Sequence, residues 1–267
     1  MKVVLTRMCM AFAYCGVAFM GIYLTHPETG DDPRAVQMLS AGDNYPSSDK
    51  PLFLAGYSEL CRIDLNGGRA LEICGGFGKL AANLAKVFPG AKVTGLDLYV
   101  PTLPEKEGWL KNAPNLSYVA GTAFDLSFLE EGSLDLVWGQ AALHHLAHST
   151  EVLCREVLRV LKPGGRLVFI FEPLGHNPLV AAIRAVRMAR AEMVDESNLF
   201  LSQIEKMGTG FSMCEVQVFN FFGYPMKAFS DQFAWLNQQV QKMDALLLKK
   251  FPKLLRYGAN CNIVFTK

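Results

Sequence analysis

The sequence lacks an excess of charge of either sign. Its 267 residues include 26 basic and 25 acidic ones, which gives a formal net charge of +1. Domains that bind nucleic acid normally show a clustered basic excess. The balance therefore predicts no nucleic-acid partner and favours a small molecule.

Cysteine patterns that hold metals or build disulfide frameworks are also missing. The seven cysteines are odd in number and scattered, and no two have the C-x-x-C spacing of many zinc and redox sites. We therefore expect no metal site and a reduced compartment, in which most of these thiols pack as small apolar groups. The cysteines are Cys9, Cys15, Cys61, Cys74, Cys154, Cys214 and Cys261.

An unambiguous membrane span is missing as well. The strongest candidate, residues 8–24, is uncharged and follows Lys2 and Arg7, but at about 1.5 Å per residue it falls short of the roughly 30 Å core of a bilayer. Three interpretations of the segment 1–24 stay open: a membrane anchor, a helix packed on the domain, and a cleaved signal. The positive-inside rule would translocate an anchored chain, away from any cofactor made in the cytosol. We therefore expect a cytoplasmic protein, with membrane contact through residues 8–24 if these form an anchor.

The rest of the chain has the composition of a globular domain, since 51% of all residues are hydrophobic and 19% are charged. Prolines, glycines and paired serines predict a polar linker over residues 25–50, followed by one domain over residues 51–267. In that domain short apolar strands alternate with amphipathic helices, which predicts an α/β fold with a doubly wound, mostly parallel seven-stranded sheet. The predicted strands are 69–73, 93–96, 116–120, 134–138, 166–171, 215–222 and 262–266, and the predicted helical stretches are 80–88, 151–161, 179–207 and 227–251.

A glycine-rich turn, Cys74-Gly75-Gly76-Phe77-Gly78, separates the first strand of this domain from its first helix. Glycines let a backbone approach a ligand closely, and the N-terminus of a helix adds partial positive charge. Such turns hold adenosine-type cofactors in doubly wound folds. Residues 76–81 also fit the G-x-G-x-x-G/A dinucleotide pattern, so the turn alone leaves nicotinamide and other nucleoside cofactors open.

Two acidic residues and one absence bear on the choice of cofactor. Glu72 lies in the strand before the turn, where a carboxylate would attract an ammonium and a sulfonium but gain nothing from a pyrophosphate. Asp97 closes the second strand about twenty residues after the turn, where an acidic side chain can take both ribose hydroxyls of either cofactor. The chain contains no Tyr-x-x-x-Lys pair, which removes one common arrangement for hydride transfer.

Residues 70–78 resemble motif I of the class I S-adenosylmethionine-dependent methyltransferases, which reads hydrophobic-E-x-G-x-G-x-G. Residues 121–126 are similar to the motif after the family's third strand. Residues 132–146 resemble the fourth-strand motif of its small-molecule, methyltransferase type 11-like members, and residues 161–167 resemble the turn before its fifth strand. The resemblance implies a Rossmann-like fold, S-adenosylmethionine as cofactor and methyl transfer to a small or lipid-like acceptor.

The resemblance also implies which residues hold the cofactor. Cys74 stands where the family has its first glycine, and Thr122 stands where an aspartate often contacts the adenine amino group, so that the backbone of Ala123 or Phe124 would make this contact. Gln140 is placed for the methionine end of the cofactor. The implied cofactor-binding residues are Glu72, Cys74, Gly76, Gly78, Asp97, Thr122, Ala123 and Gln140.

The candidate catalytic residues are His145, Glu172 and His176. Methyl transfer from a sulfonium is an in-line displacement that needs alignment, and a general base only when the acceptor must lose a proton. His145, in the pair after the fourth strand, is the candidate base, while Glu172 and His176 follow the fifth strand and are candidate acceptor contacts. Structural interpretations stay open beside these: one histidine of the pair lining its loop, and a turn network over residues 172–178.

The C-terminal part is expected to supply the acceptor side through helical elements in residues 174–211 and 227–256. Within it, cations at Lys249, Lys250 and Lys253 alternate with apolar residues, which fits a membrane surface or a helix facing the core. Two other functions also stay open. One is a nicotinamide-dependent oxidoreductase, and the other is a non-catalytic cofactor-binding or scaffold protein.

Overall fold

A single sheet runs through the part of the chain that the computed structural model describes, which comprises residues 16–19, 22–27, 32–41, 49–99, 112–189, 198–223 and 234–267. In this part the sheet has nine strands. Their spatial order is β1 (Gly16–Phe19), β2 (Ile22–Thr25), β8 (Met213–Phe219), β9 (Asn260–Thr266), β7 (Leu161–Pro173), β6 (Leu134–Gln140), β3 (Arg69–Ile73), β4 (Lys92–Asp97) and β5 (Leu116–Ala120).

The predicted fold class is confirmed. Strands β3 to β7 are parallel to one another, while β9 lies antiparallel between β7 and β8. The strand order reverses between β3 and β6, which is the switch point at which doubly wound folds bind ligands. Each of the seven predicted strands overlaps one of β3 to β9, and β1 and β2 extend the sheet beyond that prediction.

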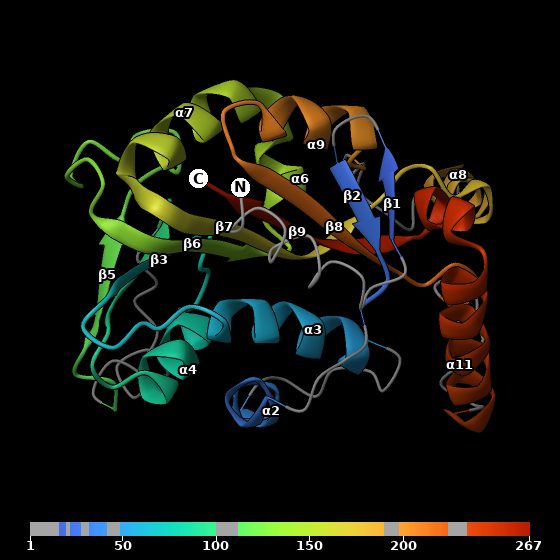
Figure 1. Ribbon diagram of the computed structural model, residues 1–267, viewed down its shortest axis with the longest axis horizontal. Coiled ribbons are helices and arrows are strands. Elements are labelled where there is room, and N and C mark those ends of the chain that lie inside the picture. The colour runs from blue at the N-terminus through green and yellow to red at the C-terminus, as the bar shows by residue number, and fades with distance from the viewer. Residues whose placement is uncertain are drawn as a thin grey trace, which may run out of the picture.

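Helices cover the sheet on both faces (Figure 1). Helices α2 (Pro33–Ala41), α3 (Lys50–Cys61) and α4 (Lys79–Val87) lie below it in this view, and α6 (Leu143–Leu146), α7 (Thr150–Val160) and α9 (Leu201–Gly208) lie above. Helices α8 (Pro178–Ala189) and α11 (Ala234–Lys250) lie at the right-hand end with the 3-10 turn η3 (Pro252–Tyr257), while a second such turn, η2 (Ala147–Ser149), links α6 to α7. Each face of the sheet buries its own hydrophobic cluster.

Amphipathic spacing explains how the covering helices dock. Helix α7 buries Leu153, Val157 and Val160 at helical intervals and leaves Glu151 exposed. The central strands show no alternation, because β3 and β6 are covered on both faces. These local patterns of apolar residues are what made the strands and helices of this domain predictable.

The N-terminal apolar run is not helical where the structure describes it. Residues 16–19 and 22–25 form β1 and β2, so both helical interpretations, the anchor and the packed helix, are wrong over these residues. Strand β2 pairs in parallel with β8 and buries Ile22 and Leu24, which accounts for the apolar character of these two residues. No helix in the described ranges has the length and hydropathy to cross a bilayer.

Other expectations differ in part from the structure. The expected linker 25–50 contains helix α2, which buries Ala35 and Met38 completely against α3 and α4. The stretch expected to be mainly helical, 179–207, divides into α8 and α9, with an isolated bridge at Leu199 before α9. Parts of four expectations lie outside the described residues: residues 1–15 and 20–21 of the N-terminal segment, 28–31 and 42–48 of the linker, 190–197, and 227–233.

A buried ion pair fixes α3 under the sheet. Arg166 on β7 donates to the Glu59 carboxylate at 2.6 Å and to the Glu59 carbonyl at 3.1 Å. Gln217 on β8 donates to the same carboxylate at 2.8 Å, and Glu59 is only 1% exposed. Asn262 on β9 adds a bond to the Leu52 carbonyl at 2.9 Å. Helix α3 is thereby held against three strands.

Removing the cation should leave a buried carboxylate without its main partner. We expect Arg166→Met to lower the free energy of unfolding by about 3 kcal/mol, measured by urea denaturation. Arg62→Met is the matched control: Arg62 also contacts Glu59, at 2.7 Å, but its side chain is 46% exposed. Its loss should cost less than about 1 kcal/mol. Equal effects of the two substitutions would contradict the assignment.

Candidate functional site

The glycine-rich turn lies at the carboxyl edge of the parallel strands, next to the strand-order switch. Cys74, Gly76 and Gly78 have φ values of 53°, 50° and 76°. The left-handed region suits glycine and costs other residues about 1 kcal/mol or more. Cys74 therefore takes the conformation of the glycine that it replaces. Burial raises the pKa of its thiol to about 12, so the group is neutral near pH 7.

Asp97, at the end of β4, contacts the turn directly. Its Oδ2 accepts a hydrogen bond from the Gly76 N–H at 2.9 Å, and the Leu96 carbonyl accepts one from the Gly75 N–H at 2.9 Å. The carboxylate expected to bind ribose is therefore already bonded to the loop that would approach the cofactor.

Tyr118, on β5, contacts the same residue of the turn, Gly76, through its carbonyl. Its hydroxyl donates to the Gly76 carbonyl at 2.7 Å, and burial raises the pKa of this phenol well above its usual value, so the donor proton stays in place. The ring covers Gly78 and Gly95, where a Cβ atom would clash with it. Tyr118 was not among the residues that the motifs predicted for the site. The available signal was Gly95, which pairs directly with Tyr118 in the β4–β5 register.

Glu72 is buried beneath the turn, with 3% of its surface exposed. Its Oε2 accepts the N–H of Ala81 at 3.1 Å, in the first turn of α4. Burial raises the pKa of this carboxyl to about 8, the Ala81 bond opposes the rise, and the nearby Asp97 charge adds to it. At neutral pH this carboxyl therefore keeps its proton, and a cationic ligand group placed beside it would favour the ionised form.

The remaining expected cofactor residues follow the neighbouring strands. Thr122, after β5, accepts the Phe124 N–H at 3.2 Å through its hydroxyl, and Ala123 is buried beside it. Gln140 ends β6, and its side-chain oxygen accepts a bond from the hydroxyl of Tyr57 on α3 at 2.9 Å. Tyr57, also missed from the sequence, is 1% exposed and so links the covering helix to this edge.

Glu172 and His144 form a buried pair at the ends of β7 and β6. Glu172 is fully buried and accepts the N–H groups of Ala142, Leu143 and His144 at 2.7, 2.9 and 3.2 Å. His144 Nδ1 lies 2.8 Å from the same carboxylate. A proton on Nδ1 satisfies this contact and leaves the imidazole lone pair on Nε2. The pair can therefore orient a base, and it also closes the N-terminus of α6.

The other two candidate histidines lie in different settings. His145 is exposed, with its ring centroid 4.0 Å from that of His144. His176 Nε2 accepts the N–H of Leu201, the first residue of α9, at 3.0 Å, and burial lowers the pKa of His176. Glu172 therefore lies against His144, while His176 accepts a hydrogen bond from the first residue of α9.

Comparison with known proteins gives matches in this same region. Residues 71–169 match the family described as a methyltransferase domain. The chain is 37% identical over 157 residues to the phthiotriol/phenolphthiotriol dimycocerosates methyltransferase of Mycobacterium tuberculosis, covering 58% of this chain and 54% of that protein. It is 34% identical over 128 residues to the ubiquinone biosynthesis O-methyltransferase of Xanthomonas oryzae pv. oryzae, covering 47% and 51%. The chain spans about half the length of these curated relatives.

A solved structure shares the fold at low identity. Haemonchus contortus phosphoethanolamine N-methyltransferase 2, in complex with S-adenosyl-L-methionine, has a TM-score of 0.53 and 20% identity to this chain. The match covers 79% of this chain and 51% of that one. At such identity it supports the architecture alone.

The pKa of Glu72 predicts how stability depends on pH. The folded value, about 8, lies above the ordinary value of 4.5, so between these limits the folded protein keeps a proton that the unfolded chain releases. The contribution of this group is full below pH 4.5 and is lost as the pH rises towards 8. Relative to Glu72→Gln, the free energy of unfolding should fall with rising pH by at most about 1.4 kcal/mol per unit.

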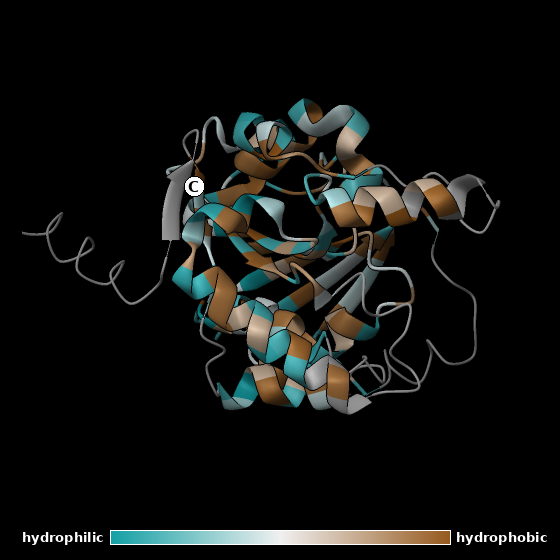
Figure 2. Ribbon diagram, turned by 90° about the vertical axis from the view of Figure 1, so that its right-hand side faces the viewer, coloured by the Kyte–Doolittle hydropathy of each residue, from teal (hydrophilic) through white to brown (hydrophobic). Residues whose placement is uncertain are grey.

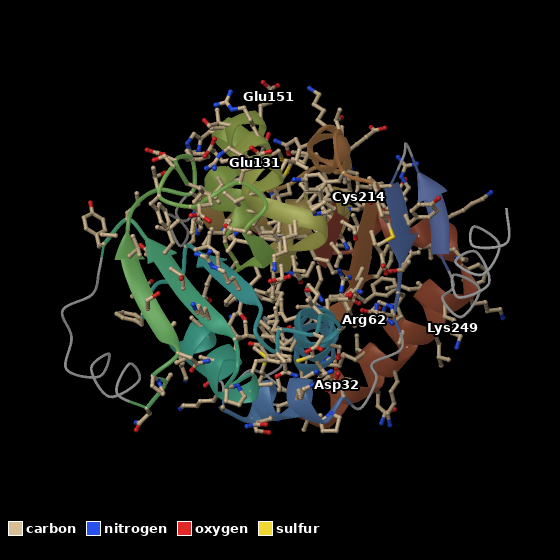
Figure 3. All side chains as sticks on the ribbon, turned by 60° about the vertical axis from the view of Figure 1, so that its left-hand side comes forward. Asp32, Arg62, Glu131, Glu151, Cys214 and Lys249 are labelled. Atoms are coloured by element: carbon tan, nitrogen blue, oxygen red, sulfur yellow. The ribbon has the colours of Figure 1, made fainter. Side chains whose placement is uncertain are left out.

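Guanidinium denaturation across this range measures the difference. The matched control is Glu131→Gln, an exposed carboxylate labelled in Figure 3, whose difference from the unmodified protein should stay flat. A flat difference for Glu72→Gln as well would contradict the raised pKa.

Proposed function

We propose that this chain, which carries a class I S-adenosylmethionine-dependent methyltransferase domain, transfers the sulfonium methyl group of that cofactor to a small or lipid-like acceptor. The family predicted from the motifs is confirmed, because the matched residues 71–169 cover nearly the whole stretch from residue 70 to 167 that carries them. With the family comes its cofactor, S-adenosylmethionine. The match also disfavours a nicotinamide-dependent oxidoreductase.

The cofactor pocket that we propose uses the residues at the carboxyl edge. Gly76 has open space where a Cβ atom would lie, which leaves room for a ligand close to the backbone. The buried Glu72 carboxyl fits the positive charge of an ammonium or sulfonium group, because such a cation beside it would lower its pKa and favour the carboxylate. Asp97 fits the ribose hydroxyls if its carboxylate gives up the hydrogen bond from the Gly76 N–H and accepts hydrogen bonds from the hydroxyls instead. Gly78, Cys74, Thr122, Ala123 and Gln140 would complete the contacts.

The bound cofactor supplies an electrophilic methyl group with a neutral thioether as leaving group. The residues of this chain then act mainly by alignment, since holding donor and acceptor in line supplies much of the rate of such a displacement. The single observation that carries this proposal is the placement of Glu72, Gly76 and Asp97 around one turn at the switch point of the sheet.

The acceptor class follows from chemistry and from the relatives. The two relatives are named for ubiquinone biosynthesis and for phthiotriol and phenolphthiotriol dimycocerosates. We infer an apolar acceptor, with residues 174–211 and 227–256 of the domain 51–267 on the acceptor side. A cytoplasmic location, where the cofactor is made, is part of this proposal.

For an acceptor that must lose a proton, His144 is our candidate base in place of His145. Its Nδ1 contact with Glu172 fixes the tautomer, whereas His145 is exposed and has no such orienting carboxylate in the described structure. Glu172 would then be a positioning residue. His176 would organise α9 on the acceptor side, since its Nε2 already accepts a backbone N–H.

Asp97→Ala should weaken S-adenosylmethionine binding at least tenfold, because lost charge-assisted hydrogen bonds cost roughly 1.5–3 kcal/mol each. Isothermal titration calorimetry measures the affinity. Asp64→Ala is the control, since Asp64 is exposed in the turn before β3, at the opposite edge of the sheet. Unchanged affinity in Asp97→Ala would refute the ribose assignment.

Methyl transfer itself is tested with the full chain, S-adenosylmethionine labelled in its methyl group and a cell extract. We expect a labelled small molecule that mass spectrometry can identify. Cofactor binding without transfer to any acceptor would support a non-catalytic cofactor-binding protein instead.

With a hydroxyl acceptor identified, His144→Asn should lower kcat by roughly a hundredfold or more, as loss of a general base does. His145→Asn should leave kcat within a few-fold of the unmodified enzyme. Equal rates for the two variants would remove His144 from this role.

A further inference from the structure

Helix α11 and the turn η3 present a surface that is both apolar and positively charged, which we call the cationic face. Leu246 is 69% exposed, Met243 48%, and Phe251, directly after the helix, 51%. The exposed residues of α11 recur at helical spacing, so they form one stripe: Gln239, Lys242, Met243, Leu246, Lys249 and Lys250. Large apolar side chains gathered in one exposed stripe mark an interaction surface.

The exposed charges of this face all have one sign. The acidic residue within residues 239–257, Asp244, is 3% exposed and accepts the N–H groups of Phe222 and Gly223 at 2.7–3.0 Å. Lys249 lies on the outer side of α11 (Figure 3). The exposed charged residues are Lys242, Lys249, Lys250, Lys253 and Arg256. The balanced net charge of the whole chain conceals this local concentration.

Helix α8 adds a second apolar surface at the same end of the molecule. Leu179 is 43% and Val186 51% exposed, and Figure 2, which views this end, shows hydrophobic bands along the helices there. The Asn177 side chain donates to the carbonyls of Phe221 and Tyr257 at 2.9 and 2.8 Å. This amide ties the start of α8 to the chain before α11 and to the end of η3.

The topology places α8 and α11 at the same edge of the sheet as the candidate cofactor site. Strands β7 and β8 both run antiparallel to β9 and therefore parallel to each other. Helix α8 follows the carboxyl end of β7, and α11 follows that of β8. The glycine-rich turn and Asp97 follow strands of this same direction, so the cationic face and the candidate site leave the sheet at one edge.

We propose that α11, η3 and α8 dock on the surface of an anionic lipid bilayer. Leu246, Met243 and Phe251 would enter the boundary between headgroups and acyl chains while the lysines meet the anionic headgroups. A nucleic acid would form ion pairs with the cationic side chains but would leave these apolar side chains exposed to water. Docking itself does not depend on the proposed function. Docking would also let an apolar acceptor pass from the bilayer into the adjoining site, and this consequence does rest on the proposed function.

Co-sedimentation of the full chain with lipid vesicles tests the docking. We expect binding to vesicles of phosphatidylcholine with phosphatidylglycerol, weak binding to phosphatidylcholine alone, and release by salt. Leu246→Glu, and separately Lys249→Glu with Lys250→Glu, should each lower the partition at least about tenfold. The matched controls are Phe128→Glu, at an apolar residue 47% exposed on the turn after β5, and Lys86→Glu, on α4. Both should bind as the unmodified protein does.

Hydrogen exchange on the same vesicles locates the contact, with slower exchange expected over residues 239–257. Equal partition of all variants, binding that ignores lipid charge, or unchanged exchange over these residues in the bound protein would each overturn the proposal. So would a dimer in solution that Leu246→Glu dissociates while no vesicle binding occurs. Calorimetry with S-adenosylmethionine on each variant separates the two proposals: retained cofactor binding with lost vesicle binding supports docking whether or not methyl transfer is found.

Discussion

The carboxylate of Glu172 satisfies a group of backbone donors that would otherwise be buried without partners. Its two oxygens take three N–H groups of the loop after β6 together with the His144 ring. Each such donor left unpaired costs about 1–3 kcal/mol, so the chain leaving β6 is held to the chain leaving β7. The positions of the histidine pair and of the segment that leads into α8 both depend on this one contact.

The sheet was predictable because its strands are marked by apolar runs that turn residues end. Strands 69–73 and 116–120 begin and end where the sequence predicts. Helix α2 was missed because its stability comes from burying Ala35 and Met38 against other helices, not from a local signal. Strand β2 was missed because its partner β8 lies far along the chain, where the Thr25 hydroxyl donates to Glu215 at 2.9 Å.

The sequence singled out residues of the candidate site but did not predict the hydrogen bonds that they make. A motif and the positions of strand ends singled out Glu72, Asp97 and Glu172, yet each carboxylate turns out to accept backbone N–H groups of nearby loops or helices. Such contacts depend on how strand ends meet in space, which spacing along the chain does not encode. For the same reason spacing along the chain could not tell which histidine of the pair lies against Glu172, since only the fold brings His144 to it.

The ring of Tyr118 fills space that three glycines leave empty. A Cβ atom at Gly75, Gly78 or Gly95 would meet the tyrosine at 3.0 Å or less. One aromatic side chain thus fills the space beside a glycine of β4 and beside two glycines of the turn. These positions are sterically coupled: a larger residue at position 95 would require a smaller side chain than tyrosine at 118, and a smaller residue at 118 alone would open a cavity beneath the turn. Variation at this edge should therefore occur as joint exchanges across β4 and β5.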